Sequence, residues 1–130
     1  MEADAVLREH GHGNLRLVDN GGVTTGPSEN MRAYHLIPAG GSKAAAVERH
    51  MRVRGLARAD TLAVGDSRED LAVAEVVASF WLVANALERD PTIADALGAH
   101  SNVRIAGAGH GGGVYEAVVT TLAERRGAGG

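Results

Sequence analysis

The sequence predicts an α/β fold built on a parallel β-sheet, and three observations indicate this fold class. From about residue 42 onward, short apolar segments alternate with segments of helical periodicity, which is the pattern of βαβ units. Hydrophobic residues make up 45% of the chain but aromatic residues only 3%, and there are 18 glycines, so the core must be built from Ala, Val and Leu with tight turns. A chain of 130 residues is one domain in size, because chains usually divide only beyond roughly 250 residues.

The first 38 residues predict the order helix, strand, loop, strand. Ala3–His10 has the spacing of a short helix, and Leu15–Val18 alternates like a half-buried strand. Asn20-Gly21-Gly22 is a turn signal, because Asn and Gly adopt positive φ at little cost. We therefore expect residues 19–30 to form a loop, with Met31–Pro38 as the returning strand.

The remaining residues predict three strands that alternate with four helices. Gly55 marks the end of the first of these helices, and Asp90 followed by Pro91 marks the start of the third. We expect the helices over Ser42–Arg54, Arg68–Ala78, Pro91–Leu97 and Val114–Arg126, and the strands over Thr61–Val64, Phe80–Ala84 and Asn102–Ala106. The inward face of the last helix is expected to carry Val114, Ala117, Val118, Thr121 and Leu122.

Charge, cysteine content and hydropathy disfavour several classes of protein and of partner. The 13 Lys and Arg against 16 Asp and Glu give a net charge of −3, which disfavours nucleic acid and anionic membranes as partners. The absence of cysteine excludes a disulfide framework and thiolate chemistry, and it fits a reducing compartment. No apolar run reaches the roughly 18 residues of a membrane span, and no basic-then-apolar leader follows Met1. We therefore expect a cytoplasmic protein that does not associate with membranes.

Two carboxylates follow the first strand of the predicted parallel sheet. Ligands of such sheets bind beyond the carboxyl ends of the strands, where Asp66 follows Gly65 and Asp70 lies one helical turn later. Two carboxylates with water and a substrate phosphate suit Mg²⁺. The alternative is helix capping, because Asp66-x-x-Glu69 and Ser67-x-x-Asp70 both have the spacing of a capping box.

A lysine opens the first helix of the alternating region. Ser42 is a favourable N-cap, so Lys43 falls in the first turn, where a positive charge is unfavourable by roughly 0.3–1 kcal/mol. A functional requirement for the cation there is one explanation. The other is an exposed lysine that tolerates the cost.

Together these two segments resemble motifs of the haloacid dehalogenase-like (HAD) superfamily. The segment Ala39-Gly40-Gly41-Ser42-Lys43 and the later Gly65-Asp66-Ser67-Arg68-Glu69-Asp70 are similar to its third and fourth motifs, a serine-lysine pair opening a helix and GDxxxD after the next strand. The nearest likeness is to phosphatases with a large cap domain, of the Cof-like and mannosyl-phosphoglycerate or sucrose phosphatase branches. Trp81 to Ala86 also resembles their apolar strand ending in Asn-Ala, and the resemblance runs from about Tyr34 to Ala123.

The resemblance implies a Rossmann-like core and a Mg²⁺-dependent phosphohydrolase that acts on a small phosphorylated metabolite through an aspartyl-phosphate. Lys43 would neutralise the transferring phosphoryl group, and Asp66 would bind Mg²⁺ directly. Asp70 would hold the metal's waters or orient Lys43. Ser67 and Asn85 would line the substrate site. A cation and a metal fixed in advance stabilise the charge that develops on phosphoryl oxygens.

The chain departs from the family pattern in one respect. The strand ending in DxDx[TV], which carries the nucleophile, and the strand ending in Ser or Thr do not occur, and the nearby Asp4 and Asp19 lack the required context. The resemblance therefore implies that residues 1–38 are the end of a cap and residues 39–130 the C-terminal half of a catalytic core. We expect the chain alone to be inactive, and we expect self-association or pairing with an N-terminal half of the same protein.

Other functional classes remain open at this stage. Gly107 to Gly112 matches GxGxxG between a strand and a helix, which would suit a nucleotide-binding module, although no second strand with an acidic residue follows. Gly65-Asp66-Ser67 also resembles the start of GDS(L) esterases, but the spacing from Asp95 to His100 does not match their late Asp-x-x-His. A third alternative is a non-catalytic α/β fragment or regulatory partner that keeps only the motif residues.

Overall fold

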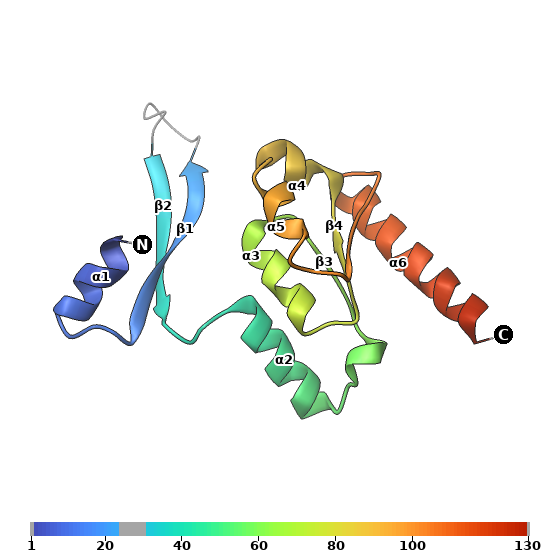
Figure 1. Ribbon diagram of the computed structural model, residues 1–130, viewed down its shortest axis with the longest axis horizontal. Coiled ribbons are helices and arrows are strands. Elements are labelled where there is room, and N and C mark those ends of the chain that lie inside the picture. Colours follow the sequence, from blue (N-terminus) through green and yellow to red (C-terminus); the bar gives the residue numbers. More distant parts are fainter. Residues whose placement is uncertain (1, 24–30, 130) are drawn as a thin grey trace. The chain divides into compact units, whose positions relative to one another are not determined.

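The computed structural model describes residues 2–23 and 31–129, and these residues form two compact units (Figure 1). The first unit is Met1–Ser42 and the second is Lys43–Gly130.

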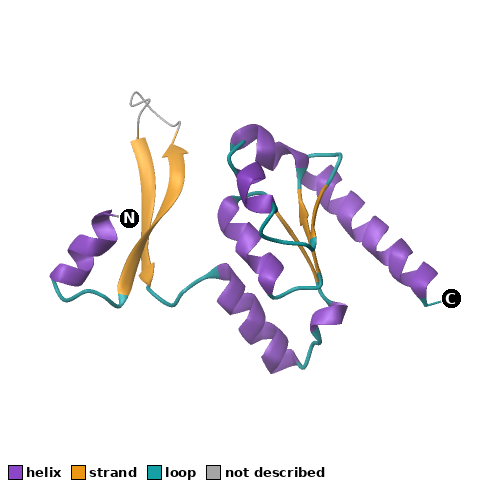
Figure 2. Cartoon of the chain, in the orientation of Figure 1, coloured by secondary structure: helices purple, strands orange, loops and turns teal. Residues whose placement is uncertain are grey.

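A helix and an antiparallel hairpin make up the first unit (Figure 2). Helix α1 spans Glu2–Glu9, strand β1 spans Leu15–Val23 and strand β2 spans Met31–Pro38. The pairing runs from Leu15 opposite Pro38 to Val23 opposite Met31. The predicted helix and the returning strand are therefore confirmed.

The turn predicted at Asn20-Gly21-Gly22 is wrong, because these residues lie inside β1. The register shifts between Asp19 and Gly22, and Gly21 has a φ of +86°, so the flexible residues form an irregularity within the ladder. The Asp19 carboxylate fixes this bend by accepting hydrogen bonds from the Gly21 N–H at 2.9 Å and from Arg32. The remainder of the predicted loop, residues 24–30, lies outside the described residues.

The second unit is built on a three-stranded parallel sheet, which confirms the predicted α/β class and its Rossmann-like half-core. Strands β3 (Leu62–Gly65), β4 (Ser79–Leu82) and β5 (Val103–Ile105) follow one another in sequence and in space, with β4 central. The helices and 3₁₀ turns are α2 (Lys43–Arg54), η1 (Arg58–Asp60), α3 (Arg68–Leu71), η2 (Ala72–Glu75), α4 (Ala84–Arg89), α5 (Ile93–Leu97) and α6 (His110–Ala128).

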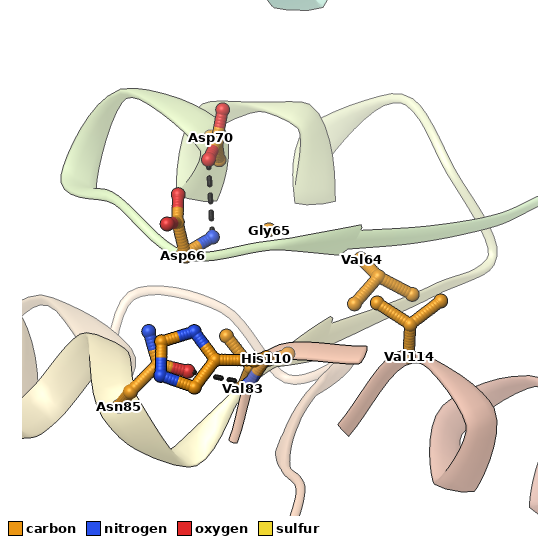
Figure 3. Close-up of a pocket in the computed structure, with 8 residues that line it drawn as sticks. All are labelled: Val64, Gly65, Asp66, Asp70, Val83, Asn85, His110 and Val114. Carbon is orange, nitrogen blue, oxygen red and sulfur yellow. Dashed lines mark hydrogen bonds between the residues drawn. The ribbon is translucent and has the colours of Figure 1, made fainter. Parts of the chain in front are cut away.

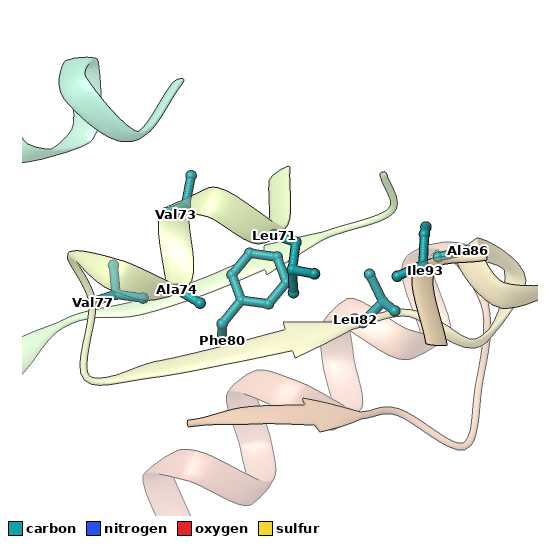
Figure 4. Packing of buried hydrophobic residues seen from close by; sticks show 8 residues of the cluster. All are labelled: Leu71, Val73, Ala74, Val77, Phe80, Leu82, Ala86 and Ile93. Carbon is teal, nitrogen blue, oxygen red and sulfur yellow. The ribbon is translucent and has the colours of Figure 1, made fainter. Parts of the chain in front are cut away.

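Strand β4 divides the core of this unit between the two faces of the sheet. Phe80 and Leu82 point to one face, and Figure 4 shows their packing against residues of the segments that connect the strands. That cluster comprises Leu71, Val73, Ala74, Val77, Phe80, Leu82, Ala86 and Ile93. Trp81 points to the other face, where it packs with Ala106 and with Ala117 of α6. The alternation along one strand thus joins both helical layers to the sheet.

One predicted helix and one predicted strand end differ from the structure. The segment predicted as one helix from Arg68 to Ala78 is α3 followed by the tighter turn η2, and this turn places both Val73 and Ala74 in the core. Ala84, predicted as the end of a strand, instead opens helix α4. This helix was not predicted, because Ala84-Asn85-Ala86 directly continues an apolar run.

The last helix begins earlier and buries less than predicted. It starts at His110 rather than Val114, and of its expected inward residues Ala117 is buried while Val114, Val118 and Leu122 are exposed. Thr121 accepts a hydrogen bond from the Trp81 indole at 3.1 Å. A sheet of three described strands is too narrow to cover the whole apolar face of a 19-residue helix.

Candidate functional site

A cavity of about 260 Å³ lies at the carboxyl ends of the parallel strands (Figure 3). The residues that line it come from the three junctions between a strand and the following helix, where ligands of parallel sheets bind. They are Val64, Gly65, Asp66, Asp70, Val83, Asn85, His110 and Val114. The valines form an apolar part of the wall, and the polar residues supply carboxylate, amide and imidazole groups.

Asp70 connects the two segments that carry the predicted lysine and metal motifs. Its Oδ1 accepts a hydrogen bond from Lys43 Nζ at 2.6 Å, and its Oδ2 accepts one from the backbone N–H of Asp66 at 3.1 Å. The Lys43 ammonium therefore contacts Asp70 directly, and Asp70 in turn holds the turn at Asp66.

This arrangement depends on the turn that follows β3. A Cβ on Gly65 would lie 2.4 Å from Asp70 Cβ and 2.9 Å from the Phe80 ring, so only glycine lets the first turn of α3 fold over the strand end. Ser67 is the N-cap of α3, and its Oγ accepts a hydrogen bond from the Asp70 N–H at 3.2 Å. The capping interaction predicted for Ser67 and Asp70 is present, and it orients Asp70 toward Lys43.

The Lys43–Asp70 pair favours the charged form of both groups. Burial raises the pKa of Asp70, but hydrogen bonds from Lys43, the Asp66 N–H and Ser67 outweigh burial and hold this pKa below its ordinary value. The hydrogen bond to Asp70 raises the pKa of Lys43. The Asp70 side chain is 16% exposed and that of Lys43 is 56% exposed, so the carboxylate is the more sheltered partner.

Asp66 is the more accessible of the two carboxylates. Its side chain is 49% exposed, and its Oδ2 lies 3.3 Å from an Arg89 guanidinium nitrogen that also donates to the Asp66 carbonyl at 2.6 Å. Within residues 2–23 and 31–129, no group of three or more His, Cys, Asp or Glu side chains is arranged to hold a metal ion. The donor set is thus two neighbouring carboxylates, which fits the preference of Mg²⁺ for one or two carboxylates completed by water.

The two residues predicted to bind substrate have different positions. Asn85 lines the cavity, and its Oδ1 accepts a hydrogen bond from the His110 N–H at 2.7 Å. Ser67 caps α3 and is not among the residues that line the cavity.

Two residues near the strand ends, Arg89 and His110, were not predicted from the sequence. Arg89 carried no local signal, because the helix that holds it was not predicted. His110 did carry one, since it is the only side chain with polar chemistry between Gly107 and Gly113.

Three backbone amides at the start of α6 and in the loop before it are bonded to side chains of the chain itself. The N–H groups of Gly107 and Ala108 donate to the Glu116 carboxylate at 3.0 and 3.1 Å, and the N–H of His110 donates to Asn85. A nucleotide pyrophosphate would need such amides, so their pairing with side chains disfavours the nucleotide-binding alternative.

Comparisons with known proteins place this fold among solved structures. No protein-family model and no curated protein matches the sequence. A haloacid dehalogenase-like hydrolase protein, yhjK from Bacillus subtilis, is similar with a TM-score of 0.58 and 20% identity, over 95% of this chain and 38% of its own. Protein 0175 from Thermoplasma acidophilum is similar with a TM-score of 0.57 and 20% identity, over 95% of this chain and 46% of its own.

The chain therefore spans less than half the length of each of these proteins. Among the described residues, no helix is both long enough and apolar enough to cross a membrane. The likeness to yhjK covers nearly the whole chain, and from this likeness together with the parallel sheet and its helices we conclude that the chain has a haloacid dehalogenase-like fold.

Proposed function

We propose that this chain supplies the lysine and metal-binding part of a Mg²⁺-dependent phosphohydrolase that cleaves phosphate monoesters. The observation that carries the proposal is the network in which Lys43 contacts Asp70 at 2.6 Å and Asp70 holds the Asp66 backbone at 3.1 Å, beside a cavity at the carboxyl end of the sheet. A cation and two carboxylates at this position suit binding of a metal together with an anionic phosphoryl group.

Each residue has a distinct proposed role. Asp66, with its more exposed carboxylate, binds Mg²⁺, and Asp70 holds the metal's waters and orients Lys43. Lys43 neutralises charge on the phosphoryl group. The bound metal would supply further stabilisation of the charge that develops on the phosphoryl oxygens. Asn85 lines the substrate side of the cavity, whereas the capping bond of Ser67 supports an indirect role for that residue.

The nucleophile of this reaction is proposed to come from a DxDx[TV] strand outside the present sequence. The two aspartates considered earlier make structural contacts in the first unit. Asp4 accepts a hydrogen bond from the Leu17 N–H at 2.9 Å, and Asp19 is paired with Arg32. We therefore propose that residues 1–38 are the end of a cap and that residues 39–130 need the other half of a catalytic core.

Metal binding tests the proposed roles of the carboxylates. We expect Asp66→Asn to weaken Mg²⁺ binding about tenfold or more, because it removes the charged ligand. Asp95→Asn, an exposed acid on α5, is the matched control and should leave Mg²⁺ affinity unchanged. Isothermal titration calorimetry measures both. Equal Mg²⁺ affinity in the parent chain and the Asp66→Asn variant would contradict the metal site.

Activity tests the proposed division of the catalytic core. Because the nucleophile and the general acid act as one unit with the metal, we expect no Mg²⁺-dependent hydrolysis of p-nitrophenyl phosphate by the 130-residue chain alone. A longer chain that includes a DxDx[TV] strand should be active and should lose activity on Asp66→Ala or Lys43→Ala. Robust activity of the short chain, abolished by Asp66→Ala, would mean that another of its residues is the nucleophile.

The same proposal predicts a partner along strand β3. Among the described strands, β3 is an edge strand beside α6, whose Val118 and Leu122 are exposed. An open strand edge beside apolar side chains favours pairing with another chain. We expect self-association, or binding of the N-terminal half of the same protein. Light scattering that shows a compact monomer at high protein concentration would contradict this expectation.

A further inference from the structure

His110 occupies an unfavourable backbone conformation at the edge of the cavity. Its φ is 51°, and it is the only non-glycine residue with positive φ among residues 2–23 and 31–129. Left-handed backbone is costly for residues with a Cβ, and glycine is the residue that usually occupies such positions. Glycines follow directly at 111, 112 and 113, so a histidine at position 110 interrupts a run of the residue that would fit best.

Neighbouring side chains hold this conformation. Asn85 Oδ1 accepts the His110 N–H at 2.7 Å, and a Cβ on Gly109 would lie 3.0 Å from that same oxygen. A Cβ on Gly113 would lie 2.5 Å from the Ala108 carbonyl oxygen and 2.7 Å from Val83 Cγ1. The start of α6 is therefore closely packed against the end of β4, and its position is fixed independently of the imidazole.

The imidazole itself has no structural task among the described residues. It is exposed, it lines the cavity, and no hydrogen bond or ion pair of its ring occurs within residues 2–23 and 31–129. The same holds for Asn85 Nδ2, since only Oδ1 of this amide is bonded. Two polar groups with unused hydrogen-bonding capacity thus lie on a wall of the cavity that Asp66 and Asp70 also line (Figure 3).

We propose that His110 and Asn85 bind the phosphoryl group of the substrate, with the imidazole N–H and the Asn85 Nδ2 amide donating hydrogen bonds to its oxygens. This inference rests on the proposed function, in which Mg²⁺ binds at Asp66. In the metal-loaded protein the ligand would meet Mg²⁺ held by Asp66 on one side of the cavity and the His110 and Asn85 side-chain donors on the other. Lys43 is already bonded to Asp70, so these donors add contacts that the lysine and metal motifs do not provide.

Phosphate binding by the parent chain and three variants tests the proposal. The probe is inorganic phosphate in the presence of Mg²⁺, followed by ³¹P NMR or calorimetry, and thermal unfolding of each variant is measured in parallel. We expect His110→Gly to weaken phosphate binding about tenfold, or ~1.4 kcal/mol, without lowering Tm, because glycine accepts the positive φ. His110→Asn tolerates this backbone and keeps a side-chain donor, so it should retain most of the affinity. His100→Ala, which does not line the cavity, is the control.

Two results would overturn the proposal. One is equal phosphate affinity in the parent chain and the His110→Gly variant, including no measurable affinity in either. The other is a lower Tm of His110→Gly with no rescue of binding in His110→Asn, which would assign the residue a structural role. Failure of the proposed function is distinguishable, because it appears as Mg²⁺ affinity that does not respond to Asp66→Asn. Loss of phosphate binding with intact Mg²⁺ binding in His110→Gly would support the inference.

Discussion

The two units of this chain are stabilised in different ways. Among the residues whose burial is described, every buried hydrophobic residue lies in the second unit, and none lies among residues 2–22 and 31–42. In the hairpin Met31, Tyr34 and Leu36 are about half exposed. The first unit is held by its strand ladder and by polar contacts, such as that of Arg16 with the Gly41 carbonyl at 2.6 Å. A two-stranded hairpin alone is marginally stable in water, so the second unit is the one able to fold around its own core.

The units also differ in how they hold their carboxylates. Asp19 and Arg32 pair on the exposed surface of the hairpin, whereas the largely sheltered Asp70 carboxylate accepts hydrogen bonds from Lys43 and from the Asp66 N–H, and the Asp70 N–H donates to Ser67 Oγ. Surface ion pairs contribute little to stability, and a sheltered carboxylate with several partners contributes more. The network beside the cavity is therefore part of the fold as well as part of the candidate site.

The largest expected effect is on the core of the second unit. Phe80 is 1% exposed and packs beneath the turn at Gly65, so Phe80→Ala should destabilise the unit by about 3–5 kcal/mol and loosen the Asp66–Asp70 turn. Leu36→Ala in the hairpin removes a side chain that is 55% exposed and is the matched control. Urea unfolding followed by Trp81 fluorescence reports the second unit, and urea unfolding followed by far-ultraviolet circular dichroism includes the hairpin. Similar losses of stability from the two substitutions would break the comparison between the units.

The pH dependence of stability should come mainly from the second unit. The pKa of Asp70 is lowered in the folded chain, so its contribution is present above the ordinary value of 3.8 and is lost as the pH falls through the folded pKa. The pKa of Lys43 is raised, so its contribution is present below 10.5 and is lost as the pH rises further. Because Lys43 is more than half exposed, we expect the pair to contribute no more than about 1 kcal/mol between these limits.

Asp70→Asn checks this dependence. The variant should show a smaller loss of Tm between pH 6 and about pH 3 than the parent chain. Asp19→Asn should leave the dependence of the second unit's stability on pH unchanged. The pKa of Asp19 is also lowered, by its hydrogen bond with Arg32, but Asp19 belongs to the other unit. An acid profile of the second unit that is unchanged in Asp70→Asn would show that the Lys43 contact has no energetic weight.

The sequence predicted those elements that have local signals. The first helix of the alternating region ends at Arg54, directly before Gly55, whose φ of +66° only glycine adopts easily, and β4 follows from a continuous apolar run. Helix α4 was missed because nothing local separates it from that run, and the bend at Gly21 was mistaken for a turn because both use positive φ. Whether a residue continues a strand, bends it or starts a helix depends on strand pairing. A local sequence pattern carries no information about that pairing.

Part of the candidate site could also be predicted from the sequence. Parallel strands bring their carboxyl ends together, so the grouping of Asp66, Asp70 and Asn85 followed from topology. Lys43 opens α2, which follows no described strand of the parallel sheet, and its relation to Asp70 was expected from the family resemblance alone. Which cation pairs with which carboxylate could not be predicted. Lys43 contacts Asp70 while Arg89 lies at Asp66, and that choice depends on side-chain geometry at a helix absent from the prediction. His110 was passed over because the glycines around it were interpreted as a nucleotide-binding loop or as a connection to the last helix.

The smallest expected effect concerns Arg89, and it sharpens the comparison between exposed and functional ion pairs. Arg89 lies 3.3 Å from Asp66 Oδ2, the carboxylate proposed to bind Mg²⁺, and donates to the Asp66 carbonyl at 2.6 Å. A guanidinium and a divalent cation repel each other at one carboxylate, so Arg89→Gln should strengthen Mg²⁺ binding by roughly two- to fivefold. Arg32→Gln removes a comparable exposed pair in the first unit and should leave Mg²⁺ affinity as it was. Calorimetry at low ionic strength measures both, and the difference should shrink as salt screens the guanidinium. Weaker Mg²⁺ binding in Arg89→Gln would mean instead that Arg89 positions the Asp66 turn for the metal, in which case Arg89→Lys, which keeps the charge, should restore part of the affinity.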